Sequence, residues 1–129
     1  MPRPGRLVVS LGPPAEFQRI ISGGGRLYGK YAVLFFARSG FDRIRLGVSA
    51  SGKAGSNVVR NRCKRLLREA VRQEAAGLGP GFDLVLIAKA SAAGRGLIDI
   101  AADVRRLFSE LASRSGLDSV GQGGAGTQC

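Results

Sequence analysis

One long segment of the chain, Val58–Ala76, repeats its apolar residues with the spacing of an α-helix. An α-helix turns by about 100° per residue, so residues three, four and seven apart share one face. Six residues with this spacing make a single apolar arc: Val59, Cys63, Leu66, Leu67, Ala70 and Val71. Gly77 and the Gly79–Gly81 turn are expected to end the helix. A long helix with one apolar face has to pack against a second layer, so this segment requires a folded domain.

The segments on either side of this helix have the patterns of strands and shorter helices. Lys30–Arg38, Arg43–Ser49 and Phe82–Lys89 are apolar or alternating runs of strand length. Ala15–Ser22 and Leu97–Ala112 have helical spacing. The order of these elements is helix, two strands with room for a third, helix, strand and helix. It predicts the α+β class, as a two-layer α/β sandwich.

The 129 residues suit one domain with short extensions. Residues 1–14 are rich in Pro and Gly, and we expect a flexible N-terminal segment there. Residues 115–129 are Gly-rich and polar, which predicts a disordered tail, so the single domain is expected to span residues 15–114. The chain has neither an apolar run long enough for a membrane span nor a signal-peptide pattern. We therefore expect it in the cytoplasm.

The charge of the chain is strongly basic. Lys and Arg together number 20 and Asp and Glu 9, which gives a formal net charge of +11. Such an excess favours a polyanionic partner, either nucleic acid or an anionic membrane surface. Sixteen of the basic residues are Arg. Because the guanidinium group binds phosphate in a bidentate manner and stacks on bases, this bias favours nucleic acid.

The composition argues against catalysis by the protein's own side chains. The chain has no His, and its two cysteines, Cys63 and Cys129, lie far apart in the sequence. This pattern disfavours a zinc site, a disulfide framework and any catalytic arrangement that needs imidazole. Asp99 and Asp103 are four residues apart, but carboxylates near a helix start are better explained by the helix dipole than by a metal site. Cys63 belongs to the apolar arc and is expected in the core.

The basic residues of Val58–Ala76 gather next to its apolar arc. This adjoining arc contains Arg60, Asn61, Lys64, Arg65, Arg68 and Arg72. Arg62 falls outside both arcs. Like charges four apart on a helix repel each other, so such a face is unfavourable for stability and well suited to a row of phosphates. The alternative is an ordinary solvated face, and charge alone does not distinguish RNA from DNA or a membrane.

The loop before the helix strengthens the anion-binding interpretation. Gly52–Gly55 is rich in glycine and carries Lys53, so its backbone can approach a phosphate closely. The helix that follows directs its first N–H groups toward the same loop. Ser56 or Asn57 is expected to cap that helix. A plain connecting loop is the alternative.

The segment Arg45–Glu69 closely resembles the ribonuclease P protein family. Its Arg60-Asn61-Arg62 triplet stands at that family's RNR signature, and further motif positions are matched by Lys53, Gly55, Lys64, Arg65, Arg68 and Glu69. Glu16–Arg19 resembles the opening of the family's first helix, and Asp83–Ala88 resembles its last strand. The chain departs from the family pattern at Ile21, Gly52 and Asn57.

The resemblance implies a fold like domain 2 of ribosomal protein S5. In that fold the helix with the RNR triplet lies in a left-handed β-α-β crossover, although general rules predict a right-handed one. The resemblance also implies a function. The chain would be the protein subunit of a ribonucleoprotein endoribonuclease, ribonuclease P, in which one protein assists one catalytic RNA in removing the 5′ leader of precursor tRNA.

In this interpretation the chemistry belongs to the RNA, and no protein residue is catalytic. Mg²⁺ would be held mainly by the RNA and the substrate, and neither DNA nor a membrane is an expected partner. The residues expected to bind RNA are Lys53, Arg60, Asn61, Arg62, Lys64, Arg65, Arg68 and Arg72. The expected leader cleft is formed by Phe17, Ile21, Phe35 and Arg45. Base stacking and phosphate pairing are both tolerant of sequence, as leader recognition requires.

Alternatives to these assignments remain at this point. Taken residue by residue, the sequence favours plain core packing for Phe17, Phe35 and Phe36. In a strand Phe35 and Phe36 face opposite ways, so at most one of them lines the cleft. A purely structural RNA-binding protein, such as a ribosomal protein of similar fold, is disfavoured by the RNR motif with its flanking strands. A DNA-reading helix is disfavoured because its neighbours look like strands. A membrane-surface helix is disfavoured because the apolar arc lacks Trp and Phe.

Overall fold

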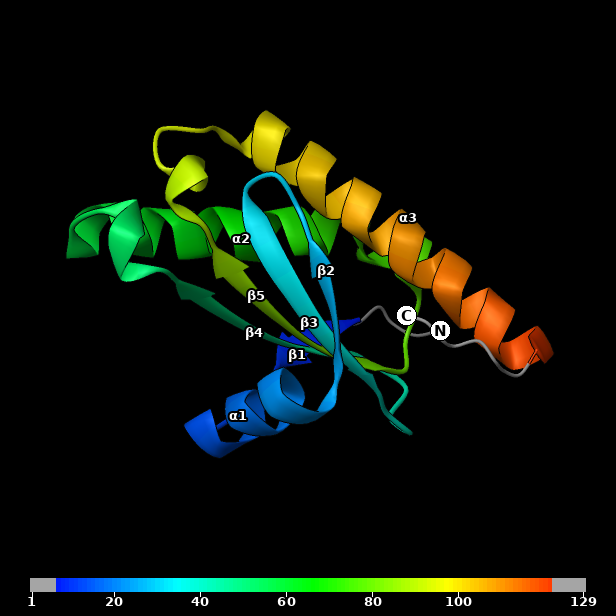
Figure 1. The fold of residues 1–129 in the computed structure, drawn as a ribbon. Coiled ribbons are helices and arrows are strands. Elements are labelled where there is room, and N and C mark those ends of the chain that lie inside the picture. The colour runs from blue at the N-terminus through cyan, green and yellow to red at the C-terminus, as the bar shows by residue number, and fades with distance from the viewer. Residues whose placement is uncertain (1–6, 122–129) are drawn as a thin grey trace.

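The computed structural model describes residues 7–121 and the side chains of residues 7–114. Its strands are β1 (Val8–Ser10), β2 (Gly25–Tyr28), β3 (Ala32–Arg38), β4 (Ile44–Ala50) and β5 (Phe82–Ala88). Its helices are α1 (Pro14–Gly23), α2 (Asn57–Leu78) and α3 (Leu97–Gly121), with short 3₁₀ turns η1 (Gly52–Ala54) and η2 (Ala90–Ala92). Figure 1 shows α2 and α3 on one side of the sheet and α1 on the other.

The sheet has five strands in the order β1-β4-β5-β3-β2. β1, β4 and β5 run parallel, whereas β3 is antiparallel to both β5 and β2. α2 therefore connects two neighbouring parallel strands, β4 and β5. The predicted α+β class and the β-α-β crossover around the basic helix are confirmed. The left hand of that crossover stays a prediction.

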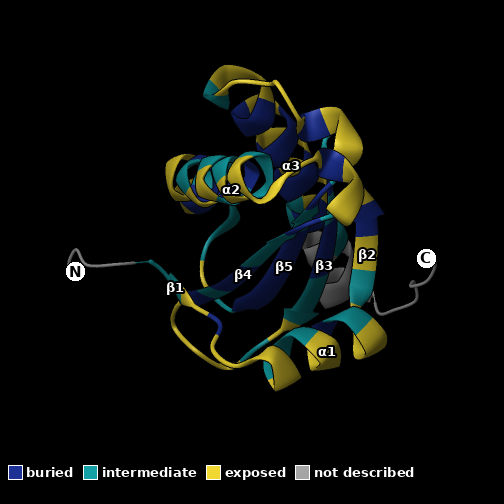
Figure 2. Cartoon of the chain, turned by 90° about the vertical axis from the view of Figure 1, so that its left-hand side faces the viewer, coloured by how far each residue is buried: buried dark blue, intermediate teal, exposed yellow. Residues whose placement is uncertain are grey.

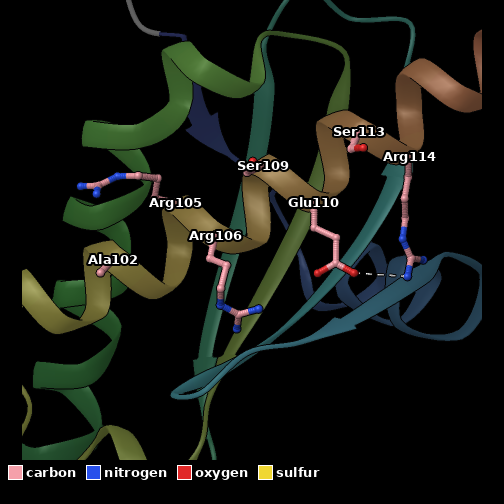
Figure 3. Close-up of a pocket in the computed structure, with 7 residues that line it drawn as sticks. All are labelled: Ala102, Arg105, Arg106, Ser109, Glu110, Ser113 and Arg114. Atoms are coloured by element: carbon pink, nitrogen blue, oxygen red, sulfur yellow. Dashed lines mark hydrogen bonds and ion pairs between the residues drawn. The ribbon is translucent and has the colours of Figure 1, made fainter.

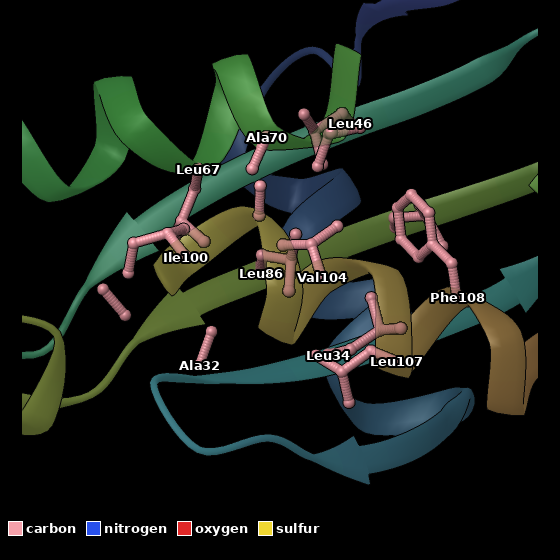
Figure 4. Packing of buried hydrophobic residues seen from close by; sticks show 14 of the residues in the cluster. Ala32, Leu34, Leu46, Leu67, Ala70, Leu86, Ile100, Val104, Leu107 and Phe108 are labelled. Atoms are coloured by element: carbon pink, nitrogen blue, oxygen red, sulfur yellow. The ribbon is translucent and has the colours of Figure 1, made fainter. Parts of the chain in front are cut away.

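The main core lies between the sheet and the two long helices. Leu34, Leu84 and Leu86 from the strands meet Leu67 of α2 and Leu107 of α3, and all five are at most 1% exposed. Figure 4 shows Leu34, Leu67, Leu86 and Leu107 between the strands and the two helices, and Figure 2 shows β5 buried at the centre of the sheet. The arc predicted for α2 is confirmed, since Cys63, Leu67, Ala70 and Val71 are buried and Val59 and Leu66 are partly buried.

A smaller core lies on the opposite face of the sheet, under α1. Ile20 and Phe35 pack there with Val85 and with Leu11, which precedes the helix. α1 is only ten residues long, so it covers a part of this face. Val33 and Ile87, on neighbouring strands, pack against this core but remain partly exposed.

The ends of the domain differ from the sequence prediction. Val8–Ser10, expected in a flexible segment, pair with Ile44–Leu46 as strand β1, and the next residue, Leu11, is 3% exposed. A strand of three residues beside Pro and Gly has too short a pattern to be recognised, because its pairing partner lies far away in the sequence. α3 continues beyond Ala112 to Gly121, into the predicted tail. Residues 1–6 and 122–129 lie outside the described residues.

The predicted order left room for a third strand only after the first two, whereas β3 is preceded by the additional strand, β2. Gly24 and Gly25 enter this strand where the backbone passes very close to Phe36 of β3. A side chain at either glycine would overlap that residue, so the close approach requires glycine.

The predicted cap of α2 is Ser56, whose Oγ accepts a hydrogen bond from the backbone N–H of Val59 at 3.4 Å. None of the described helices has the length and hydropathy of a membrane span.

Asp103 of α3 connects that helix to the turn between β2 and β3. Its carboxylate accepts hydrogen bonds from the backbone N–H groups of Lys30 and Tyr31, both at 2.9 Å, and pairs with Arg106 at 3.1 Å. The side chain is 4% exposed. Asp99, in the first turn of the helix, is half exposed and suits the predicted dipole role, whereas Asp103 supports a turn instead.

We expect Asp103→Ala to lower the free energy of unfolding by about 2–4 kcal/mol, because two backbone N–H groups of the β2–β3 turn lose a buried acceptor. Asp99→Ala is the matched control on the same helix and is expected to cost less than about 1 kcal/mol. Urea denaturation of both variants measures the difference. Equal losses would show that Asp103 does not hold the turn.

Candidate nucleic-acid interface

The outer face of α2 carries cations without protein partners. Lys64, Arg65 and Arg68 make neither a hydrogen bond nor an ion pair with any residue that the structure describes. Arg65 and Arg68 are exposed and Lys64 is half-buried. Arg72, one turn further on, pairs with Glu69 of the same helix at 3.3 Å. Most of the positive charge on this face is therefore available to a ligand.

The arginines of α3 contrast with those of α2, because each has an acid beside it. Arg105 pairs with Glu74 of α2 at 3.2 Å, and Arg114 pairs with Glu110 at 3.5 Å. A shallow depression on this helix has a volume of about 570 Å³. Figure 3 shows the residues that line it, Arg106 among them. Both signs of charge line it, so it is less suited to a polyanion than the outer face of α2.

The two arginines of the RNR triplet make hydrogen bonds within the protein, whereas the asparagine between them is exposed. Arg60 donates to the carbonyl of Ala50 at 3.5 Å and to Asn57 Oδ1 at 3.4 Å, and its Nε is buried with no partner among the described residues. Arg62 donates to the carbonyl of Arg95 at 3.0 Å. Asn61 between them is exposed. The two arginines therefore connect the start of α2 to β4 and to the loop before α3.

Lys53 lies close to this surface in sequence and is exposed within η1. Ser51 caps that short turn, since its Oγ accepts from the backbone N–H of Lys53 at 3.1 Å. The side chain of Lys53 is thus presented on a capped turn that directly precedes α2. The sequence prediction that this loop approaches a ligand remains a prediction.

A groove runs along the free part of the β4 edge, between β1, α1 and α2. Its volume is about 310 Å³. Phe17 of α1 and two cations of α2, Arg68 and Arg72, line it. The remaining walls are Val8, Val9, Ser10, Gly12, Leu46, Gly47 and Val48. The Phe17 ring lies directly on Gly47, where any side chain would overlap it. The fold thus combines an aromatic ring and a row of cations in one groove.

The other residues predicted for a leader cleft lie apart from this groove. Ile21 packs against the core under α1, and Phe35 is only 8% exposed there. Phe36 packs on the opposite face of the sheet, as the strand alternation predicts. The guanidinium of Arg26 lies 5.8 Å from the centre of the Phe35 ring and 5.6 Å from that of exposed Tyr28. Arg26 and Tyr28 are surface residues that the sequence analysis did not identify.

The guanidinium group of Arg45 is paired with the buried carboxylate of Asp83. Its Nε and Nη2 donate to the two carboxylate oxygens of Asp83 at 2.8 and 2.6 Å, and Arg19 adds a bond of 2.9 Å. The ring of Phe41 stacks on Arg45 with its centre 4.4 Å from the guanidinium carbon. Asp83 was not predicted as a site residue. The sequence feature that could have identified Asp83 is its position as the single acid in the otherwise apolar run of β5.

The pKa of Asp83 reflects this geometry. Burial raises the pKa of the carboxyl, but the hydrogen bonds from Arg45 and Arg19 outweigh burial and hold the pKa below its usual value of 3.8. The same hydrogen bond raises the pKa of Arg45. A carboxyl with a lowered pKa stabilises the fold above its unfolded pKa, and this contribution disappears as the pH falls through the folded value.

We therefore expect Asp83→Asn to destabilise the fold by about 3 kcal/mol at neutral pH, because two arginines lose a buried partner. The difference from the parent protein should shrink as the pH falls below about 4, where the parent carboxyl also becomes protonated. Asp42→Asn is the control, since Asp42 is 88% exposed and its pair with Arg43 is long, at 3.6 Å. Denaturation curves across this pH range test the expectation, and a difference independent of pH would contradict it.

The described residues contain no group of three His, Cys, Asp or Glu side chains that could hold a metal ion together. Cys63 is 1% exposed in the main core, which confirms its predicted packing role. Cys129 lies outside the described residues.

Comparison with known proteins places this geometry in context. The ribonuclease P family matches residues 8–112, beginning at the first residue of β1. The ribonuclease P protein component of Clostridium acetobutylicum is 35% identical over 98 residues, which cover 74% of this chain and 82% of that protein. Among solved structures, the RNase P protein of Thermotoga maritima matches with a TM-score of 0.71 and 26% identity, over 79% of this chain and 96% of the other. That of Staphylococcus aureus matches with a TM-score of 0.69 and 25% identity, over 83% and 96%.

Proposed function

Since the chain belongs to the ribonuclease P protein family, we propose that it binds the catalytic RNA of this endoribonuclease through the outer face of α2. The observation that carries the proposal is the set of unpaired cations on that face, which contrasts with the paired arginines of α3. An RNA backbone supplies the missing counter-charges at regular spacing. The helix repeat brings Lys64 and Arg68 to neighbouring positions along this row.

The groove beside α2 suits the single-stranded 5′ leader of precursor tRNA. Phe17 offers an aromatic surface, and Arg68 and Arg72 offer phosphate contacts along the same groove. Stacking and phosphate pairing accept any base, so leaders of different sequence can share this site. Phe35 and Ile21 then contribute indirectly: they pack under α1 and hold that helix, with its Phe17, on the sheet.

In this proposal the protein binds and orients RNA while the RNA performs the cleavage. The two buried acids, Asp83 and Asp103, are paired with arginines, and the other described acids are spread along the sequence. The chain also has no His to act as a general acid or base. Mg²⁺ would be held mainly by the catalytic RNA and the substrate. The protein assists by lowering the electrostatic cost of bringing two polyanions together, with one protein per catalytic RNA.

The deciding experiment is the cleavage of a 5′-extended precursor tRNA by a bacterial ribonuclease P RNA at low Mg²⁺, with and without this protein. We expect strong stimulation at the mature 5′ end and no cleavage by the protein alone. A purely structural RNA-binding protein would bind without stimulating cleavage. Absence of stimulation with an RNA that is active at high Mg²⁺ would therefore refute the proposed subunit role.

The double variant Arg65→Gln, Arg68→Gln tests the α2 face directly. We expect weaker binding to the catalytic RNA and a log–log salt slope that is shallower by about 0.7–0.9 for each phosphate that the variant no longer binds. Arg105→Gln, Arg114→Gln removes the same charge from α3 and is the matched control. Filter binding over a range of salt concentrations gives both quantities. If the two double variants lose affinity equally, net charge alone explains binding.

A further inference from the structure

A second basic surface lies where α2 begins, built from the β2–β3 turn and the loop between β5 and α3. Lys89 joins the two through its backbone N–H, which donates to the carbonyl of Tyr31 at 2.8 Å, and through Nζ, which donates to the carbonyl of Gly29 at 3.0 Å. Ser91 Oγ donates to the carbonyl of Lys30 at 2.7 Å. Figure 1 shows the turn, η2 and the start of α3 at the same end of the sheet. The turn and the loop therefore form one ordered unit.

This unit is connected to the RNR triplet by a direct hydrogen bond. Arg62 Nη1 donates to the backbone carbonyl of Arg95 at 3.0 Å. The bond fixes the backbone of Arg95, and the side chain of Arg95 lies over the ring of Tyr31. Gly94, with a φ of +82°, makes the turn that precedes this residue. The surface is thus positioned relative to α2 through Arg62, a residue that lies outside the basic arc of that helix.

Tyr31 lies at the centre of the surface with two cations over its ring. The Arg95 guanidinium is 5.4 Å and the Lys30 ammonium 5.8 Å from the ring centre. Lys30 and Arg95 are exposed, and Tyr31 is partly exposed. An aromatic ring flanked by cations offers a base a stacking surface and offers the attached phosphates their counter-charges.

The acids near this surface do not cancel its charge. Asp99 lies 3.8 Å from Arg95 and offsets part of its charge, whereas Lys30 makes no ion pair with any residue that the structure describes. Asp103 is buried, and its oxygens are used by the N–H groups of the turn and by Arg106. The outward-facing charge around Tyr31 therefore remains positive.

We propose that Lys30, Tyr31 and Arg95 form a second RNA-binding surface, separate from the groove and from the outer face of α2. It takes the phosphodiester backbone of RNA on its two cations and an unstacked base on Tyr31. This inference rests on the proposed function, because it assumes an RNA partner. Two RNAs supply the same chemistry, namely the catalytic RNA and the precursor tRNA, so the test treats them separately.

The test compares the double variant Lys30→Gln, Arg95→Gln and the single variant Tyr31→Leu with the parent protein. Arg105→Gln, Arg114→Gln is the charge-matched control. One arm titrates a bacterial ribonuclease P RNA with the full-length protein, and the other measures precursor tRNA affinity for the assembled holoenzyme at saturating protein. Thermal unfolding of each variant is recorded first. A near-parental melting temperature is expected for Lys30→Gln, Arg95→Gln, whose side chains are exposed, and a lower one for Tyr31→Leu, because Tyr31 packs against the main core. All affinities are measured well below these temperatures.

We expect the Lys30/Arg95 variant to lose at least about fivefold in affinity in one arm and to lower its salt slope by about 0.7–0.9 for each phosphate that it no longer binds. Tyr31→Leu should lose roughly fivefold in the same arm with its salt slope unchanged. The RNA whose binding is weakened in the variants is the one that this surface contacts. Parental affinity of both variants in both arms would overturn the inference while leaving the proposed function intact. A parent protein that binds neither RNA would refute the proposed function itself.

Discussion

The burial of one side of α2 against the parallel pair β4 and β5 determines the rest of the structure. Because Cys63, Leu67 and Val71 are fixed in the core, the opposite side of the same helix has to face outward. The helical repeat then places its cations in a row on the surface, whatever they bind. Stability and binding are thereby assigned to opposite sides of a single element. The repulsion within the row is offset by the apolar contacts that hold the helix down.

The acids of the chain are distributed in a way that explains where the positive charge is available. Two of them, Asp83 and Asp103, are buried and organise the backbone or arginines around them. Others pair with the arginines of α3 on the surface. The outer face of α2 has mainly Glu69, which pairs with Arg72 near the end of the helix. A net charge of +11 therefore becomes a localised surface and not a uniform one.

Sequence reasoning predicted the parts of this structure that depend on local repeats. The apolar arc of α2 follows from a fixed turn per residue and could be assigned from spacing alone. The same spacing placed Asn61, Arg65, Arg68 and Arg72 on the exposed side, whereas Arg60 of the predicted basic arc donates to the carbonyl of Ala50. Pairings between distant segments could not be assigned. β1 needs Ile44–Leu46 to exist, Arg45 is withdrawn from the surface by Asp83, and Arg62 finds a carbonyl in a loop 33 residues away. The groove combines such distant pieces, so only its Phe17 and its arginines were predictable.

The pairing of β1 with β4 has a consequence for motion. β1 is a three-residue edge strand, held on one side only, and it forms one wall of the groove. Short edge elements with few hydrogen bonds open locally at a small fraction of the global unfolding free energy. Opening of β1 would widen the groove while α2 stays packed, because α2 packs mainly against α3 and β4. Hydrogen exchange should therefore be faster in β1 than in β4 or β5, and the width of the groove can fluctuate independently of the charged face.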